Sequence, residues 1–266
     1  MNGNWLSPRR FSLRISAAIL GICLSWSATA TAEQRQIGPF DVWSQFSLQP
    51  YVGKGGLFQD LAQIQQDLKR SLGVSEPKSR IRMHFFSDKS AYERYLRQTF
   101  PKVPRRPALF IEHKGKLMVF AYRGSNFETD VRHETTHALL HADLPMVPLW
   151  LDEGLAEYFE LEPKRRATEN PYFGKTRWSA QFGIAPRITS LEKKADLADM
   201  GAAEYRYAWA WVHFMLHGPR EAHGELVGYL ADIRNHTPPG QLSDRLKRSV
   251  PRVEKRFVEH FRSWRR

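Results

Sequence analysis

The sequence predicts an α+β protein in which an N-terminal mixed α/β lobe with a small sheet is followed by a C-terminal helical lobe. Three observations lead to this prediction. Strand-like and helix-like segments intermingle in the first half, and no convincing strand appears from Pro145 onward. Between the two halves lies a His-Glu-x-x-His pattern, at residues 133–137. The expected segments are a signal at 1–32 and lobes at 33–144 and 145–266.

Residues 1–32 have the pattern of a secretory signal peptide. Three arginines between residues 9 and 14 precede the apolar run "ISAAILGICLSW", and "ATATA" offers cleavage after residue 30 or 32. We therefore expect an exported protein, periplasmic or secreted. An uncleaved N-terminal membrane anchor is the alternative. "RRFSL" resembles a twin-arginine signal, which leaves the export route open.

Composition limits both the ligands and the partners. The only cysteine, Cys23, lies in the apolar run of the signal, so a metal in the mature chain must be held by His, Asp or Glu. The net charge is +12. In an exported protein this charge favours contact with anionic envelope surfaces rather than nucleic acid, and no nucleic-acid partner is expected. A generally basic soluble surface without a specific partner is the simpler alternative.

The N-terminal lobe begins with a predicted helix over residues 57–72, where apolar residues recur at helical spacing and a glycine follows. "RIRMHFF" (80–86) alternates as a half-buried strand does. A second helix is predicted over about 90–100, with Ser90 and Glu93 as a capping box and a proline after it.

Two apolar runs, "ALFIE" (108–112) and "KLMVFAY" (116–122), are predicted to form a β-hairpin that turns near Gly115. The chain then enters the helix that contains His133, which we call the metal helix. The metal helix is thus expected directly after a strand, at the join of the two lobes.

The second half is predicted to be helical. "PLWLDEGLAEYFE" (148–160) accepts its proline in the first turn of a helix, and residues 163–200 read as irregular and charged. Three further helical segments lie within 204–217, 225–234 and 252–264.

The metal helix carries the residues of a zinc site. One helical turn places His133 and His137 on the same face, where both imidazoles can bind one ion. Glu134 lies beside the ion, where a carboxylate can take a proton from a metal-bound water.

Three downstream residues are candidates for the third protein ligand. His141 continues along the same helix, but an ion held by the first two histidines lies well below it. Asp143 has the spacing of a ligand that follows a sharp turn at a glycine, yet Leu140 occupies the glycine position. Glu153 fits best, because a second helix can bring its carboxylate back to the histidines.

The neighbours of Glu153 support that second helix. Gly154 is expected to allow close approach to the metal helix. Glu157 falls on the same face one turn later, well placed to accept the other ring N–H of a zinc-binding histidine.

"HETTH" followed by "PLWLDEGLAEYFE" resembles the gluzincin branch of zinc metallopeptidases, most closely the peptidase-MA-like domains of exported bacterial proteins. The resemblance implies a zincin-like fold and one Zn²⁺ bound by His133, His137 and Glu153. It also implies that Glu134 is the general base and that Glu157 is the carboxylate behind a histidine ligand. The chain has no "GxMEN"-like segment, so an aminopeptidase of the M1 type is not expected.

The resemblance also implies a residue that stabilises the oxyanion and a strand that binds substrate. Tyr205 is the candidate for the first role, with Tyr207 and His213 as weaker ones, although these aromatic residues equally fit simple packing of the helical lobe. An extended peptide is expected to pair along the edge of "KLMVFAY".

The function expected from the sequence is a zinc metallopeptidase that hydrolyses peptide bonds in a peptide or protein substrate. A catalytically silent zincin-like binding or scaffold module of the cell envelope is the alternative. Glu134 argues against it, since a binding module needs no base beside the metal. A third reading, a basic surface-binding protein with a coincidental HETTH, leaves Glu153, Gly154 and Glu157 unexplained.

Overall fold

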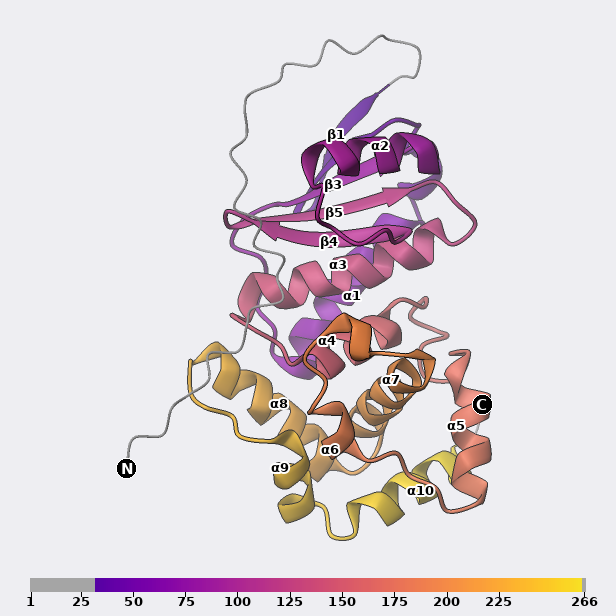
Figure 1. Ribbon diagram of the computed structural model, residues 1–266, viewed down its shortest axis with the longest axis vertical. Coiled ribbons are helices and arrows are strands. Elements are labelled where there is room, and N and C mark those ends of the chain that lie inside the picture. The colour runs from indigo at the N-terminus through magenta and orange to yellow at the C-terminus, as the bar shows by residue number, and fades with distance from the viewer. Residues whose placement is uncertain (1–31, 265–266) are drawn as a thin grey trace.

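The computed structural model describes residues 32–264 and confirms the α+β class, with a sheet-containing part followed by a helical part (Figure 1). The predicted signal peptide at 1–32 lies, apart from its last residue, outside the described residues. Within the described range, no helix combines the length and the apolar character needed to span a membrane.

A mixed sheet of five strands, in the order β1-β2-β3-β5-β4, forms the N-terminal part. The inner strands β2, β3 and β5 are parallel neighbours, and the two outer strands pair antiparallel to them. The strands are β1 (Glu33–Ile37), β2 (Phe40–Ser44), β3 (Ile81–Phe86), β4 (Ala108–His113) and β5 (Lys116–Tyr122). The expected strand at 80–86 and the hairpin are confirmed, whereas β1 and β2 were not predicted.

The hairpin between β4 and β5 turns at Lys114 and Gly115, which have φ angles of 50° and 70°. Two successive left-handed residues give the backbone twist that a two-residue hairpin loop needs. The expected turn near Gly115 is therefore confirmed.

Three helices flank the sheet: α1 (Leu57–Leu72), α2 (Lys89–Thr99) and α3 (Phe127–Asp143). Helix α1 ends as predicted, at Gly73 in the left-handed conformation. Helix α2 begins one residue earlier than expected, because Asp88 rather than Ser90 is its N-cap. The Asp88 side chain accepts a hydrogen bond of 2.9 Å from the backbone N–H of Ala91.

The two faces of the sheet bury alternate residues. In β5, Leu117 and Val119 join the main core with α1 and α3, while Met118 and Phe120 pack with α2 in a smaller cluster on the opposite face. Figure 1 shows α2 above the sheet and α3 with α1 below it. The main core continues from there into the helical part.

Seven helices form the C-terminal part: α4 (Leu149–Phe159), α5 (Tyr172–Gln181), α6 (Ile188–Leu191), α7 (Ala202–His217), α8 (Arg220–Arg234), α9 (Leu242–Ser249) and α10 (Val253–Ser263). Short 3₁₀ turns lie at Gln49–Tyr51 and Leu197–Asp199. The expectation that 163–200 is irregular was wrong for α5 and α6, and α9 was not predicted. Helix α5 is short, and its core contacts come from Phe173, Thr176 and Ala180 against distant helices.

Candidate metal centre

The candidate centre lies where α3 crosses α4, just after the chain leaves β5 (Figure 1). His133, His137 and Glu153 each present a ligand atom, and these three atoms lie within 4.8 Å of one another. The convergence predicted from the sequence, with Glu153 arriving on a second helix, is therefore confirmed.

The Glu153 carboxylate points one oxygen at both histidines. Its Oε2 lies 3.6 Å from Nε2 of His133 and 3.9 Å from Nε2 of His137. Ligand atoms about 2.1 Å from a tetrahedral zinc ion are separated by about 3.4 Å. The same Oε2 is buried and has no hydrogen-bond partner. A buried carboxylate oxygen that faces two Nε2 atoms without a hydrogen bond fits a cation ligand, so these residues match the requirements of zinc.

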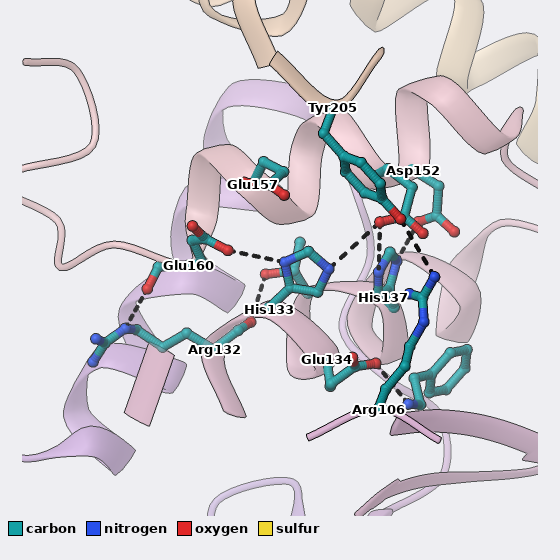
Figure 2. A network of polar contacts seen from close by, with 12 residues as sticks. Arg106, Arg132, His133, Glu134, His137, Asp152, Glu157, Glu160 and Tyr205 are labelled. Carbon is teal, nitrogen blue, oxygen red and sulfur yellow. Dashed lines mark hydrogen bonds and ion pairs between the residues drawn. The ribbon is translucent and has the colours of Figure 1, made fainter. Parts of the chain in front are cut away.

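The remaining ring nitrogens of the two histidines contact other carboxylates. Nδ1 of His133 lies 3.0 Å from Oε2 of Glu160, and Nδ1 of His137 lies 2.9 Å from Oδ1 of Asp152. In Figure 2, Glu160 lies beside the His133 ring and Asp152 beside the His137 ring. Such contacts fix the ring orientation and leave Nε2 for a metal ion.

The predicted contact between Glu157 and a histidine N–H is therefore wrong, because Glu160 and Asp152 make it instead. Glu157 accepts a hydrogen bond of 3.5 Å from the hydroxyl of Tyr172. Helices α3 and α4 run in opposite order along their contact, so the start of α4 meets His137 and its end meets His133.

Glu157 nevertheless lies close to the centre. Burial and the neighbouring Glu160 carboxylate raise its pKa to about 8. His133, Glu157 and Glu160 form a second group with closely spaced ligand atoms. In this second group Glu160 contacts Nδ1 of His133, whereas Glu153 faces the Nε2 atoms of both histidines, which favours the group containing Glu153.

The two rejected ligand candidates have other partners. His141 contacts Oδ2 of Asp152 through Nε2 at 2.9 Å, so Asp152 joins two histidines of α3. Asp143 accepts a hydrogen bond of 2.6 Å from Nε of Arg234 on α8 and another from the backbone N–H of Ser75. These contacts agree with the helix-end roles inferred from the sequence.

Gly154 allows a close approach, but to α7 rather than to the metal helix. A Cβ atom at this position would lie 2.8 Å from the backbone carbonyl of Ala208 and 3.0 Å from Cγ2 of Val212. The expected partner was thus wrong. The glycine lets α4 pack tightly on α7, which holds Glu153 from behind.

Glu134, the predicted general base, is a residue of α3, the metal helix, and its side chain points toward the sheet. Its Oε2 accepts a hydrogen bond of 2.6 Å from the backbone N–H of Phe110 in β4 (Figure 2). β4 is the outer strand of the sheet, whereas β5 pairs with a neighbour on each side. The expected substrate edge on "KLMVFAY" (β5) is therefore wrong, because the free edge beside the site belongs to β4.

Tyr205 lies at the start of α7 and extends toward the centre (Figure 2). Its hydroxyl accepts a long hydrogen bond of 3.5 Å from a terminal guanidinium nitrogen of Arg106. Burial and the Glu153 carboxylate raise the pKa of Tyr205, so its phenol stays protonated at neutral pH.

The two weaker tyrosine and histidine candidates lie elsewhere. The guanidinium of Arg206 lies over the Tyr207 ring, with its Cζ atom 4.9 Å from the ring centroid. His213 is buried among the helices, where Nδ1 contacts His260 at 2.9 Å and Nε2 contacts the Ala167 carbonyl at 2.9 Å. Of the three candidates for stabilising the oxyanion, only Tyr205 extends toward the candidate metal centre, where its hydroxyl accepts the hydrogen bond from Arg106.

Three residues of the centre were missed by the sequence reasoning: Arg106, Asp152 and Glu160. Asp152 and Glu160 belong to the quoted segment "WLDEGLAEYFE", whose several carboxylates were a visible signal. Arg106 precedes β4 and has no local signal. The Tyr205, Glu153 and Glu134 side chains raise its pKa against the opposing effect of burial, which places its charge among the acidic groups of the centre.

No protein-family model matches the sequence, and no curated protein does either. Among solved structures, the chain is similar to the M1 zinc metallopeptidase from Deinococcus radiodurans, with 16% identity and a TM-score of 0.46. It is also similar to a single-residue mutant of that enzyme, with 16% identity and a TM-score of 0.47. Each alignment covers 88% of this chain and 52% of the solved chain, so this chain spans about half the length of those structures.

Proposed function

We propose that this chain is an exported zinc-dependent metallopeptidase with a zincin-like fold, in which His133, His137 and Glu153 bind one zinc ion. The observation that carries the proposal is the buried Oε2 of Glu153, which faces the Nε2 atoms of both histidines without a hydrogen bond. The carboxylates on the opposite ring nitrogens give further support, because zinc-binding histidines usually have such partners. Export rests on the signal-like pattern of residues 1–32.

Zinc held by His133, His137 and Glu153 would supply Lewis acidity for activating water and for polarising the carbonyl of a peptide bond. Glu134 accepts the proton of the attacking water and passes it to the leaving amine. Its carboxylate extends from the metal helix and contacts the backbone of β4, so the general base lies beside the strand that is proposed to bind the substrate.

Tyr205 donates a hydrogen bond from its phenolic hydroxyl to the oxyanion that develops on the carbonyl oxygen. Arg106 donates to the Tyr205 oxygen, so the hydroxyl proton is free to point into the site. An extended peptide pairs along the outer edge of β4, where the Phe110 N–H already faces Glu134.

The proposal is tested by measuring zinc content and hydrolysis of a mixed peptide library for the unsubstituted protein, called the parent, and for Glu134→Gln. The variant should retain about one zinc ion per chain, since Glu134 is not a ligand, and should lose hydrolysis by at least about 100-fold. Zinc-loaded parent protein that cleaves no peptide would instead support the binding or scaffold module.

A further inference from the structure

The exposed large hydrophobic residues of the described chain all lie in one short segment. Trp178 is 65% exposed, Phe182 65% and Ile184 56%. They occupy the last turns of α5 and the loop that follows, at the outer side of the helical part (Figure 1). Single exposed apolar residues are ordinary, but three within seven positions form a patch that needs an explanation.

The patch is held in a fixed arrangement. The Trp178 and Phe182 rings are in contact, with centroids 4.8 Å apart. The backbone N–H of Ile184 bonds back to the Ser179 carbonyl at 3.1 Å, which folds the loop over the helix end. On α10, Arg262 donates to the carbonyl oxygens of Ala180 and Gln181, both at 2.7 Å.

The opposite face of α5 explains why these side chains remain outside. Phe173, Thr176 and Ala180 are buried, and the Phe173 ring packs edge-on against Trp209 and Phe261. The core contact of the helix is thus complete, and the exposed rings belong to its other side.

The surroundings of the patch are basic. Residues 170–191 contain no Asp or Glu and three cations, Lys175, Arg177 and Arg187. None of the three forms an ion pair with another residue in the described part of the chain. Lys175 precedes Trp178 by three positions, so both lie on the exposed face of α5.

We propose that the α5 patch, formed by Trp178, Phe182 and Ile184 with the three cations, binds the surface of an anionic lipid bilayer. Tryptophan and phenylalanine side chains partition into the headgroup region, and each Lys or Arg near an anionic surface adds attraction. Uncompensated cations beside exposed rings match both features of such a surface. The inference does not depend on the proposed peptidase activity.

Helix α5 also connects the patch to the candidate metal centre. Its first residue, Tyr172, donates to Glu157, and ten helical residues span about 15 Å. A chain docked through the patch therefore holds the centre close to the bilayer surface.

The first test compares full-length parent and variants in co-sedimentation with vesicles of phosphatidylglycerol and phosphatidylcholine in equal amounts. The triple variant Trp178→Ser, Phe182→Ser, Ile184→Ser should lose at least about ten-fold in vesicle affinity. The double variant Lys175→Gln, Arg187→Gln should bind several-fold more weakly than the parent at low salt. The matched control, Lys247→Gln with Arg248→Gln, removes two exposed cations of α9 and should bind as the parent does. Equal binding by the parent and the triple variant would overturn the proposal.

The second test separates the patch from the apolar run in residues 1–31, which can itself attract lipid. In a Cys23→Ser background, an environment-sensitive dye is attached at Gln181→Cys or, as control, at Lys69→Cys on α1. Anionic vesicles should shift the emission of the dye at position 181 to the blue and leave the dye at 69 unchanged. A lipid-binding patch would be contradicted by no shift at position 181 or by equal shifts at both positions. It would also be contradicted if the parent bound no vesicles but self-associated, and the triple variant lost that self-association.

Discussion

Glu153 is 4% exposed, and its buried Oε2 lies 3.6 Å from Nε2 of His133 and 3.9 Å from Nε2 of His137. The His133 and His137 rings are oriented by Glu160 and Asp152, so the three potential ligand atoms are held in place by a layer of carboxylates. We expect the arrangement of this layer to set how tightly the candidate centre binds a cation.

Asp152 is the most connected member of that layer, since it accepts from both His137 and His141. Although burial opposes ionisation, the two histidines hold its pKa far below the usual range. Asp152→Asn keeps the shape and removes the negative charge behind His137. We expect zinc affinity to fall by about 10- to 100-fold, measured by competition with a chelator at fixed pH.

Glu157→Gln is the matched control for this change. Glu157 lies on the same helix but contacts Tyr172 rather than a histidine ring, so its replacement should leave zinc affinity within about three-fold of the parent. Equal losses in the two variants would show that general charge near the centre, and not the ring contact, sets the affinity.

The convergence of the three candidate ligands could be predicted from the sequence, whereas the carboxylates behind them could not. His133, His137 and Glu153 follow from the helical repeat and from one returning helix. Which acidic residue meets which ring depends on the relative order of α3 and α4 along their contact. Spacing within α4 alone does not fix that order, and Glu157 was therefore assigned a contact that Glu160 makes.

At the element scale, α4 is clamped between α3 and α7. Its contact with α7 is close because Gly154 removes a side chain opposite Ala208. The helix thus carries Glu153, the candidate metal ligand, on one side and a tight backbone contact on the other.

Gly154→Ala should destabilise the protein by about 1–3 kcal/mol, because the added methyl group meets the rigid backbone of α7. Gly174→Ala is the control, since a Cβ there meets nothing within 4 Å and alanine favours a helix by about 1 kcal/mol. Urea unfolding of both variants and the parent measures the effect. If Gly154→Ala were as stable as the parent, α7 would not limit the position of α4.

Elements with strong local periodicity were predictable, and those that depend on distant partners were not. Helix 57–72 and the hairpin carry their apolar pattern and their turn residues in sequence. Strand β1, with the polar sequence "EQRQI", is defined by its pairing with β2, and helix α5 by contacts with α7 and α10. Such nonlocal pairings leave no clear periodic signal.

At the scale of the whole molecule, one continuous core joins the sheet to the helices, and a cluster of histidines lies within its helical half. His213 contacts His260, and His217 contacts the Tyr158 hydroxyl at 2.7 Å on α4. Burial, together with neighbouring histidines, lowers the pKa values of His217 and His260 to about 4. These rings are therefore neutral in the folded protein near pH 7.

This cluster should make folding stability depend on pH. In the unfolded chain a histidine titrates near pH 6.5, so the unfolded state binds more protons than the folded state between about pH 6.5 and 4. Stability is thus complete above this range and falls as the pH decreases through it, by about 2 kcal/mol for each histidine between pH 6.5 and pH 5. Urea unfolding at pH 7 and pH 5 should show a smaller loss for His217→Gln than for the parent. Equal losses would show that His217 does not contribute.

We propose that Glu153, rather than a residue nearer to the histidine pair, completes a zinc centre. The most direct measurement is zinc per chain, by elemental analysis, in the parent, Glu153→Ala and Asp143→Ala, with folding checked by circular dichroism. We expect one zinc ion per chain in the unsubstituted protein, none in Glu153→Ala and one in Asp143→Ala. A centre that loses its zinc in Asp143→Ala and retains it in Glu153→Ala would contradict the assignment.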